Sequence, residues 1–324
     1  MDSIFDQGRK SWIDSLRALA ILLVIYGHLI RGVSEYYIFT GPVKMPLFFA
    51  ISGYLFKMRD GESGSFFRNL VKKLIIPWFC LALIVFPPKL FMGASVLEFV
   101  GNLISGKSLW FMPCFVIAEV IHFFVRKFTK NDYQIAIVCI LLTVLGIFLH
   151  SIDILDYAMI NRAFSVQFFF LIGYLFKIHE KSFVGLSWGV IFFGGLLYFL
   201  LIFLSLFLFP KSSIDVHLCR YYNYPLCFAL IIIGLVVSFT ASAKSDFSNR
   251  LLSMIGQNTL VLYIWHGSII WVLNFFMDYY KIRMGSLWLD ALVKTICIVA
   301  ICVILSSYLN RYVPELVGKP RKTR

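Results

Sequence analysis

Apolar runs long enough to cross a membrane recur from one end of this 324-residue sequence to the other. Backbone groups inside a bilayer must hydrogen-bond to one another, so such runs form helices or closed barrels. The runs are continuous and do not alternate as barrel strands do, which favours helices. Only 15% of the residues are charged and 60% are hydrophobic, whereas about a quarter of a soluble globular chain is charged. We therefore predict an all-α, polytopic integral membrane helix bundle.

The apolar runs divide into about ten predicted transmembrane helices. They cover residues 12–30, 45–58, 74–86, 109–125, 133–149, 163–176, 184–209, 223–243, 251–276 and 287–309. The second span is short for a hydrocarbon core about 30 Å thick and could be tilted or partly re-entrant. No linker or soluble-domain-sized segment separates the spans. We therefore predict one membrane domain over residues 1–324, with cytoplasmic tails at 1–11 and 310–324.

The basic residues indicate how the bundle is oriented. With the N-terminus inside, the inner segments hold nineteen lysines and arginines and the outer segments hold nine. Positive residues prefer the cytoplasmic side, so this bias predicts that both termini are cytoplasmic and that the span number is even. The net charge of +13 is therefore an orientation signal rather than a sign of nucleic-acid binding. The acidic Asp2 and Asp6 do not fit the basic start of a cleaved signal peptide.

The first predicted span carries ionisable side chains on one face. Arg17 and His28 are eleven positions apart, which on a helix is three turns plus about 20° and about 16 Å along the axis. Asp14 shares this face because it lies three residues before Arg17. A charge at mid-membrane costs at least ~2.5–3.5 kcal/mol and usually marks a functional interior. The alternatives are a satisfied core histidine and an arginine that reaches the lipid phosphates.

Two further pairs of polar residues lie within predicted spans. Glu119 and His122 are three positions apart, as are Tyr263 and His266. Each pair can be a hydrogen-bonded part of the bundle interior or part of a site, because three residues is close to one helical turn. The seven cysteines show no metal-ligand spacing, so we predict no metal site.

A basic cluster ends the predicted inner loop 57–73. Its members Arg68, Lys72 and Lys73 fit two interpretations. They can orient the chain and bind anionic lipid, or they can recognise a phosphorylated cytoplasmic cofactor.

Two segments of the chain are similar to each other. Residues 48–57 read FFAISGYLFK and residues 168–177 read FFFLIGYLFK. We infer no duplicated fold, because Ile137 and Phe148 stand at the positions equivalent to Arg17 and His28. Recurrent aromatic, small and interfacial lysine residues suffice to explain the similarity.

Five motifs follow one another in the order of a known family. They are an arginine and histidine eleven positions apart (Arg17 and His28), PLFFAISG at 46–53, KKLIIP at 72–77, LWFMP at 109–113, and a glycine-to-histidine motif, GQNTLVLYIWH, at 256–266. With these motifs the sequence resembles the membrane acyltransferase-3 family, particularly its branch of fucose 4-O-acetylase-like enzymes that acylate polysaccharides. Two positions depart from the common pattern. Ala18 stands where many members have glycine, and Lys72 stands where many have the second arginine of an Arg-x-x-Arg pair.

The resemblance implies an O-acyltransferase of the bacterial inner membrane. Such an enzyme moves an acyl group, usually acetyl, from cytoplasmic acetyl-CoA or another acyl-CoA to a sugar hydroxyl. The acceptor is a lipid-linked or polymeric glycan such as O-antigen or exopolysaccharide. A neutral histidine, with a pKa near ~6.5, suits proton removal from the hydroxyl.

The resemblance and the spacing together give a set of expected site residues. We expect His28 to act as general base or transient acyl carrier and Arg17 to hold the donor or stabilise negative charge. Asp14 would orient Arg17. We expect further support from Tyr263, His266, Glu119 and His122, and donor binding by Arg68, Lys72 and Lys73.

Other classes of protein also fit a bundle with interior charges. A transporter or flippase of lipid-linked sugars would need no acyl donor. A structural partner in a polysaccharide assembly complex would tolerate substitution of Arg17 and His28.

Overall fold

The computed structural model describes residues 10–30, 32–57, 63–85, 95–209, 214–247 and 249–321. These residues are helical almost throughout, and the only β-type pairing among them is an isolated bridge between Asp215 and Arg220. The predicted all-α, polytopic membrane fold is therefore confirmed.

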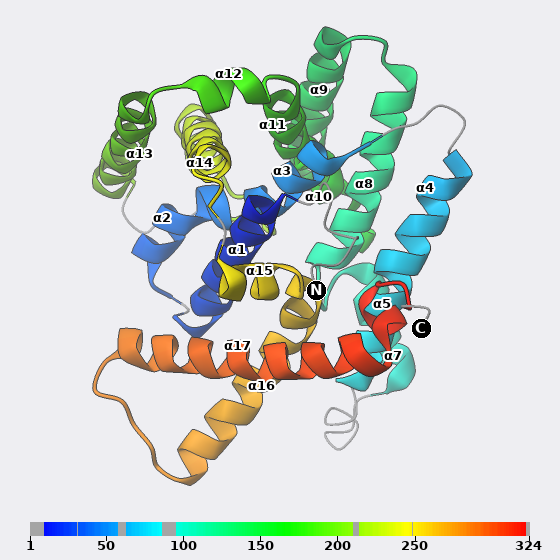
Figure 1. Cartoon of the computed structure of the whole chain (residues 1–324), viewed down its shortest axis with the longest axis vertical. Helices are drawn as coiled ribbons and strands as arrows, with labels where there is room; N and C mark the ends of the chain where they lie inside the picture. The colour runs from blue at the N-terminus through cyan, green and yellow to red at the C-terminus, as the bar shows by residue number, and fades with distance from the viewer. Residues whose placement is uncertain are drawn as a thin grey trace.

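Figure 1 shows the helices as one bundle. In chain order they are α1 (Ser11–Leu29), α2 (Ser34–Lys44), α3 (Pro46–Leu55), α4 (Ser63–Leu70), η1 (Val71–Ile75), α5 (Ile76–Ile84), α7 (Val96–Ser105), α8 (Phe111–Phe128), α9 (Asp132–Ser151), η2 (Tyr157–Met159), α10 (Ile160–Ser165), α11 (Gln167–Ile178), α12 (Glu180–Gly185), α13 (Trp188–Leu208), α14 (Tyr224–Lys244), α15 (Arg250–Gly256), α16 (Thr259–Tyr279), α17 (Leu287–Tyr312) and η3 (Pro314–Val317).

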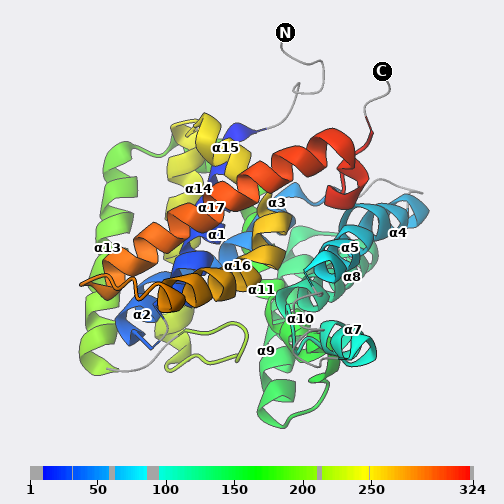
Figure 2. The same ribbon diagram turned by 90° about the horizontal axis from the view of Figure 1, so that it is seen from below.

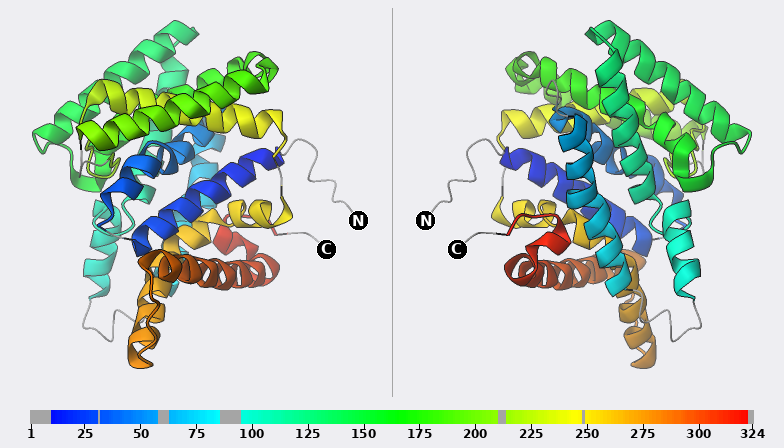
Figure 3. Two further views of the ribbon diagram at one scale, coloured as in Figure 1. Left: turned by 90° about the vertical axis from the view of Figure 1, so that its left-hand side faces the viewer. Right: turned by 90° about the vertical axis from the view of Figure 1, so that its right-hand side faces the viewer.

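Helix α1 lies in the interior of the bundle. It contacts α2, α3 and α14 on one side and α15, α16 and α17 on the other (Figures 1 and 3). In its most apolar stretch 61% of the residues are buried within the protein, against 17% for the peripheral α13. Most of α1 therefore contacts other helices.

Each of the ten predicted spans corresponds to a helix. Among the described residues, seven helical segments are long and apolar enough to cross a membrane, and the bent pair of Tyr157–Ser165 and Gln167–Ile178 makes a possible eighth. The other two predicted spans correspond to α8, which carries Glu119, Arg126 and Lys127, and to α5, which continues α4 and η1. Three charged residues distinguish α8 from an ordinary span, and short length distinguishes α5.

The second span differs from the prediction. It begins at Ser34 and runs through α2 and α3 to Leu55, so it is longer than the predicted 45–58. Lys44, which the sequence placed in an outer segment, lies within it. The helix is interrupted at Met45, between Pro42 and Pro46. A proline has no N–H to donate, so two of them so close together weaken the helix there.

The two similar segments pack against each other, as α3 and α11. A Cβ atom at Gly53 would collide with the carbonyl oxygen of Phe170, and one at Gly173 would collide with that of Ala50. Ala50 lies three positions before Gly53, and Phe170 lies three positions before Gly173. Each glycine therefore meets the equivalent residue of the other segment. The sequence similarity therefore corresponds to a reciprocal helix crossing, of the close kind that small residues allow.

The start of α1 and the short helix η3 lie on the same side of the molecule (Figures 2 and 3). Lys319, just after η3, donates a hydrogen bond of 3.3 Å to Asn258 Oδ1 at the start of α16. This arrangement fits an even number of membrane crossings. The predicted cytoplasmic location of that side remains a prediction.

Candidate functional site

The guanidinium of Arg17 is held at the start of α1. Its Nη1 lies 3.7 Å from Asp14 Oδ1, and Gln257 Nε2 donates a hydrogen bond of 3.4 Å to Asp14 Oδ2. Gly256 packs so closely on the Asp14 backbone that a Cβ atom would not fit. The Asp14 side chain is 4% exposed and that of Arg17 is 31% exposed. Arg17 is therefore anchored on one side and accessible on the other.

A second carboxylate approaches Arg17 from another helix. Glu119 of α8 is half-buried, lies near Ser52 of α3, and is close enough to Arg17 for their charges to interact. Three helices therefore supply the polar group at this level, which we call the arginine level: Asp14 and Arg17 from α1, Ser52 from α3 and Glu119 from α8.

The predicted pairing of Glu119 with His122 does not form. His122 is fully buried, and neither of its ring nitrogens hydrogen-bonds to Glu119. Its ring lies 4.9 Å from the ring of Phe56 and 4.9 Å from that of Phe170. His122 thus belongs to an aromatic region beside the arginine level.

Two histidines face each other at the other end of α1. The rings of His28 and His266 are 5.0 Å apart, centre to centre, with 35° between their planes. Nδ1 of His266 lies 3.0 Å from the carbonyl oxygen of Leu262. Because a carbonyl only accepts hydrogen bonds, this contact favours the tautomer with the proton on Nδ1. Nε2 of His266 is then a base or an acceptor.

Tyr263 connects this histidine pair to α8. Its ring centre is 6.2 Å from that of His266, and its hydroxyl oxygen accepts a hydrogen bond of 3.2 Å from the backbone N–H of Phe111. Phe111 belongs to the LWFMP motif, so two separate sequence motifs meet here. We call the group of His28, His266 and Tyr263 the histidine level.

The two levels lie on one face of α1. Eleven residues separate Arg17 from His28, which corresponds to about 16 Å along the helix. The segment from the end of α15 into α16 reaches both, because Gln257 contacts Asp14 and His266 contacts His28. An elongated ligand that binds at one level could therefore place its reactive end at the other level.

The predicted donor-binding residues lie apart from both levels. Arg68, Lys72 and Lys73 are exposed on α4 and η1. The η1 segment is a π-helical turn, and such turns occur frequently at functional sites. The role of these residues in donor binding remains a prediction.

The structure adds a cation that the sequence analysis did not single out. Lys44 is half-buried, and its Nζ lies 4.1 Å from the ring centre of Tyr37 and 5.4 Å from that of Tyr36. It is also 3.6 Å from the position that a Cβ atom at Gly27 would occupy. Because α2 contains polar residues, the sequence did not indicate that it forms the first half of the second span. The signal that could have revealed the site is a lysine between two prolines, directly before an apolar run.

The loop before α14, on the predicted outer side, borders this region. The ring of His217 stacks on that of Trp110 at 4.7 Å, and Arg162 Nε donates a hydrogen bond of 2.9 Å to the His217 carbonyl. Burial is the main cause that lowers the pKa of His217, so its ring is neutral near pH 7. Ile214 of the same loop packs on Gly41 of α2.

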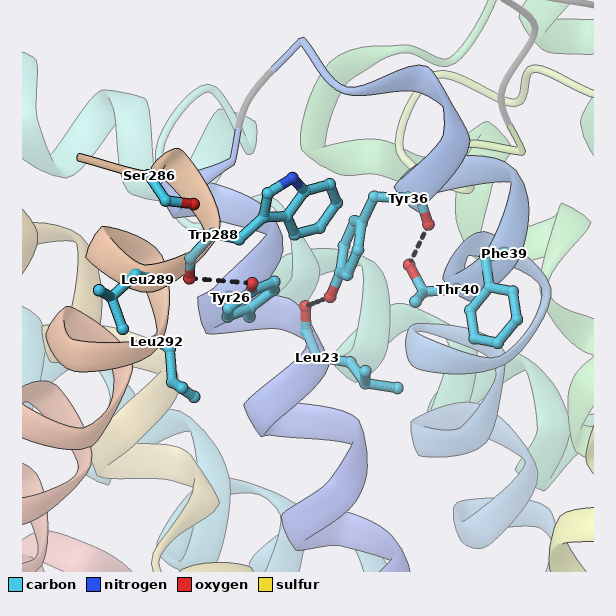
Figure 4. A pocket seen from close by; sticks show the side chains of 9 residues that line it. All are labelled: Leu23, Tyr26, Tyr36, Phe39, Thr40, Ser286, Trp288, Leu289 and Leu292. Atoms are coloured by element: carbon cyan, nitrogen blue, oxygen red, sulfur yellow. Dashed lines mark hydrogen bonds between the residues drawn. The ribbon is translucent and has the colours of Figure 1, made fainter. Parts of the chain in front are cut away.

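A lateral groove lies on the opposite side of α1 (Figure 4). It has a volume of about 630 Å³ and is lined by Leu23, Tyr26, Tyr36, Phe39, Thr40, Ser286, Trp288, Leu289 and Leu292. Tyr26 donates a hydrogen bond of 3.2 Å to the Trp288 carbonyl. Tyr26 lies two residues before His28 and so points about 160° away from it. The groove is therefore distinct from the histidine level.

Comparison with known proteins identifies one family. A family model described as an acyltransferase domain, of the acyltransferase-3 type, matches residues 10–307. A search of curated proteins and a search of solved structures gave no significant match. The matched range includes both levels of the site and Lys44.

Proposed function

Because this chain belongs to the membrane acyltransferase-3 family, we propose that it is an O-acyltransferase that moves an acetyl group from cytoplasmic acetyl-CoA to a sugar hydroxyl. The acceptor would be part of a cell-surface or secreted polysaccharide, and the enzyme would lie in the bacterial inner membrane. The observation that carries this proposal is the face of α1, with an accessible Arg17 at one end and a paired His28 at the other.

The donor would bind from the side on which α1 begins. Acyl-CoA carries several phosphates, and the exposed Arg68, Lys72 and Lys73 provide positive charge that would attract them. Arg17 would hold a polar part of the donor further along, by charge-assisted hydrogen bonds. The thioester would then lie near His28, about three helical turns away.

The transfer step needs a base beside the thioester. The sugar hydroxyl oxygen attacks the carbonyl carbon, and His28 takes the hydroxyl proton. The carbon–sulfur bond then breaks, and the coenzyme A sulfur leaves and takes up a proton. His266 is positioned to orient His28 or to share its proton, because their rings are 5.0 Å apart.

The test is mass spectrometry of surface glycans from a strain that lacks the gene and from complemented strains. We expect an acetyl-sized mass difference that wild type restores and that His28→Ala and His266→Ala do not. The matched control is His179→Ala, because His179 is exposed and outside both levels. Acetylation that persists with His28→Ala at normal protein abundance would contradict the mechanism.

The prolines Pro42 and Pro46 within the α2–α3 span favour one other function, because helix-weakening residues are typical of the spans that form the substrate sites of many transporters. A flippase of lipid-linked sugars would give a different result in the same experiment. Deletion would remove the polysaccharide from the surface and leave the acetylation of the remaining glycan unchanged.

A further inference from the structure

Arg17 is too far from the histidine level for its positive charge to act there. When a hydroxyl attacks a thioester, the carbonyl oxygen acquires a negative charge, and enzymes stabilise that charge with a preorganised donor or cation. A thioester beside His28 lies about 16 Å along α1 from Arg17, further than an arginine side chain extends. A different group has to stabilise the oxyanion.

Lys44 is a cation beside the last turn of α1, on the side of Gly27, whose direction on the helix lies about 100° from that of His28. Its Nζ lies 3.6 Å from the Cβ position at Gly27, the residue directly before His28. Tyr37, whose ring is 4.1 Å from the same Nζ, donates a hydrogen bond of 2.8 Å to the Gly27 carbonyl. The ammonium group is thus fixed against the last turn of α1.

Lys44 lies between two prolines, Pro42 and Pro46, within one membrane span. Lys44 ends α2, and Met45 separates it from α3, which begins at Pro46. Met45 itself keeps helical φ and ψ angles of −84° and −42°, so α2 and α3 form one span. An ionisable residue within a membrane span is expected to have a function.

A carboxylate whose charge acts on Lys44 is hydrogen-bonded elsewhere. Asp215 acts on Lys44 through its charge, but its Oδ1 accepts hydrogen bonds of 2.9 Å from His217 N–H and 3.2 Å from Leu218 N–H. Asp215 therefore helps to fix the outer loop. The aromatic rings of Tyr36 and Tyr37 favour a cation without neutralising it.

We propose that Lys44 stabilises the oxyanion that forms on the thioester carbonyl oxygen during acyl transfer at His28. This inference rests on the function proposed above. Negative charge develops on that oxygen when the hydroxyl attacks, and it returns to the carbon as a carbonyl bond when the carbon–sulfur bond breaks. Lys44 keeps its proton throughout. Arg17 then serves donor binding, and Lys44 serves the chemical step.

The test compares Lys44→Met and Lys44→Arg with wild type. Membranes that contain the full chain and the native glycan are supplied with radiolabelled acetyl-CoA at a series of concentrations. We expect Lys44→Met to lower kcat by about 10²–10³-fold, the loss typical of an oxyanion-stabilising group. Lys44→Arg should recover part of kcat, and the KM for acetyl-CoA should change less than threefold in both variants.

The matched control is Lys177→Met. Lys177 lies in another span, where its Nζ donates a hydrogen bond of 2.6 Å to the Phe56 carbonyl. With protein abundance and thermal stability measured for each variant, Lys177→Met should keep the wild-type kcat per folded molecule. Arg17→Met should have the opposite effect from Lys44→Met: the KM for acetyl-CoA should rise strongly and kcat should change less.

Two outcomes separate the two proposals. If wild type transfers acetyl groups and Lys44→Met keeps its kcat, the role of Lys44 is overturned and the proposed function stands. A loss in Lys44→Met that follows only the amount of folded protein also overturns that role. If wild type transfers no acetyl group, both proposals fail.

Discussion

Arg17 illustrates how a charge is accommodated within a helix bundle. Burying a charge without a partner is costly, and Arg17 has Asp14 on its own helix and Glu119 on α8. The sequence predicted the first partner, because residues three apart on a helix are neighbours. It could not predict the second, because Glu119 is 102 positions later and its approach depends on how α8 packs.

The two partners give a test of coupling at the residue scale. Arg17→Met should destabilise the protein by leaving carboxylates unpaired, and adding Glu119→Gln to that variant should recover part of the loss. The expected interaction energy between the two positions is about 0.5–3 kcal/mol. Thermal unfolding in detergent of the two single variants and the double variant measures it. The control is Glu98→Gln, an exposed position on α7. Additive losses for Arg17 and Glu119 would show that the two do not interact.

The elements show both what hydropathy reveals and what it conceals. Each predicted span has a helix in the described residues, and seven or eight of these helical segments are long and apolar enough to cross a membrane, because each span must bury its backbone and suit the membrane. The second span was mispredicted, since Glu35, Thr40 and Lys44 make its first half polar. The similarity of α3 and α11 was visible in the sequence, but only the packing shows that the two segments cross each other.

That crossing depends on two glycines, which gives a prediction at the element scale. Gly53→Ala and Gly173→Ala each place a methyl group against a backbone carbonyl of the other helix. We expect each change to destabilise the protein by about 1–3 kcal/mol, as overpacking does. Gly195→Ala on α13 is the control, because nothing lies within 4 Å of its Cβ position. Unchanged melting temperatures for Gly53→Ala and Gly173→Ala would show that the helices do not approach so closely.

The whole molecule surrounds α1 with other helices. A central first span was expected from its ionisable face, because such faces avoid lipid. Its neighbours could not be derived from the sequence. Contacts such as His28 with His266 join positions more than 230 residues apart, and no local pattern specifies which spans become adjacent.

The same-side arrangement of α1 and η3 leads to a prediction about topology. With an even number of spans and the basic residues inside, a fluorescent protein fused after residue 324 should fluoresce, because it remains in the cytoplasm. Alkaline phosphatase fused there should be inactive. The same phosphatase inserted after Ile154, in the exposed turn between α9 and α10, should be active. The reverse pattern of fluorescence and phosphatase activity would show that the chain has the opposite orientation in the membrane.

The reciprocal crossing of α3 and α11 also has a consequence for biosynthesis. Gly53 and Gly173 are 120 positions apart, and ribosomes add about 5–20 residues per second. The groove around Gly53 therefore waits about 6–24 s for its partner after it enters the membrane. During that interval lipid or a chaperone must cover it, and slow translation between the two segments would prolong the exposure.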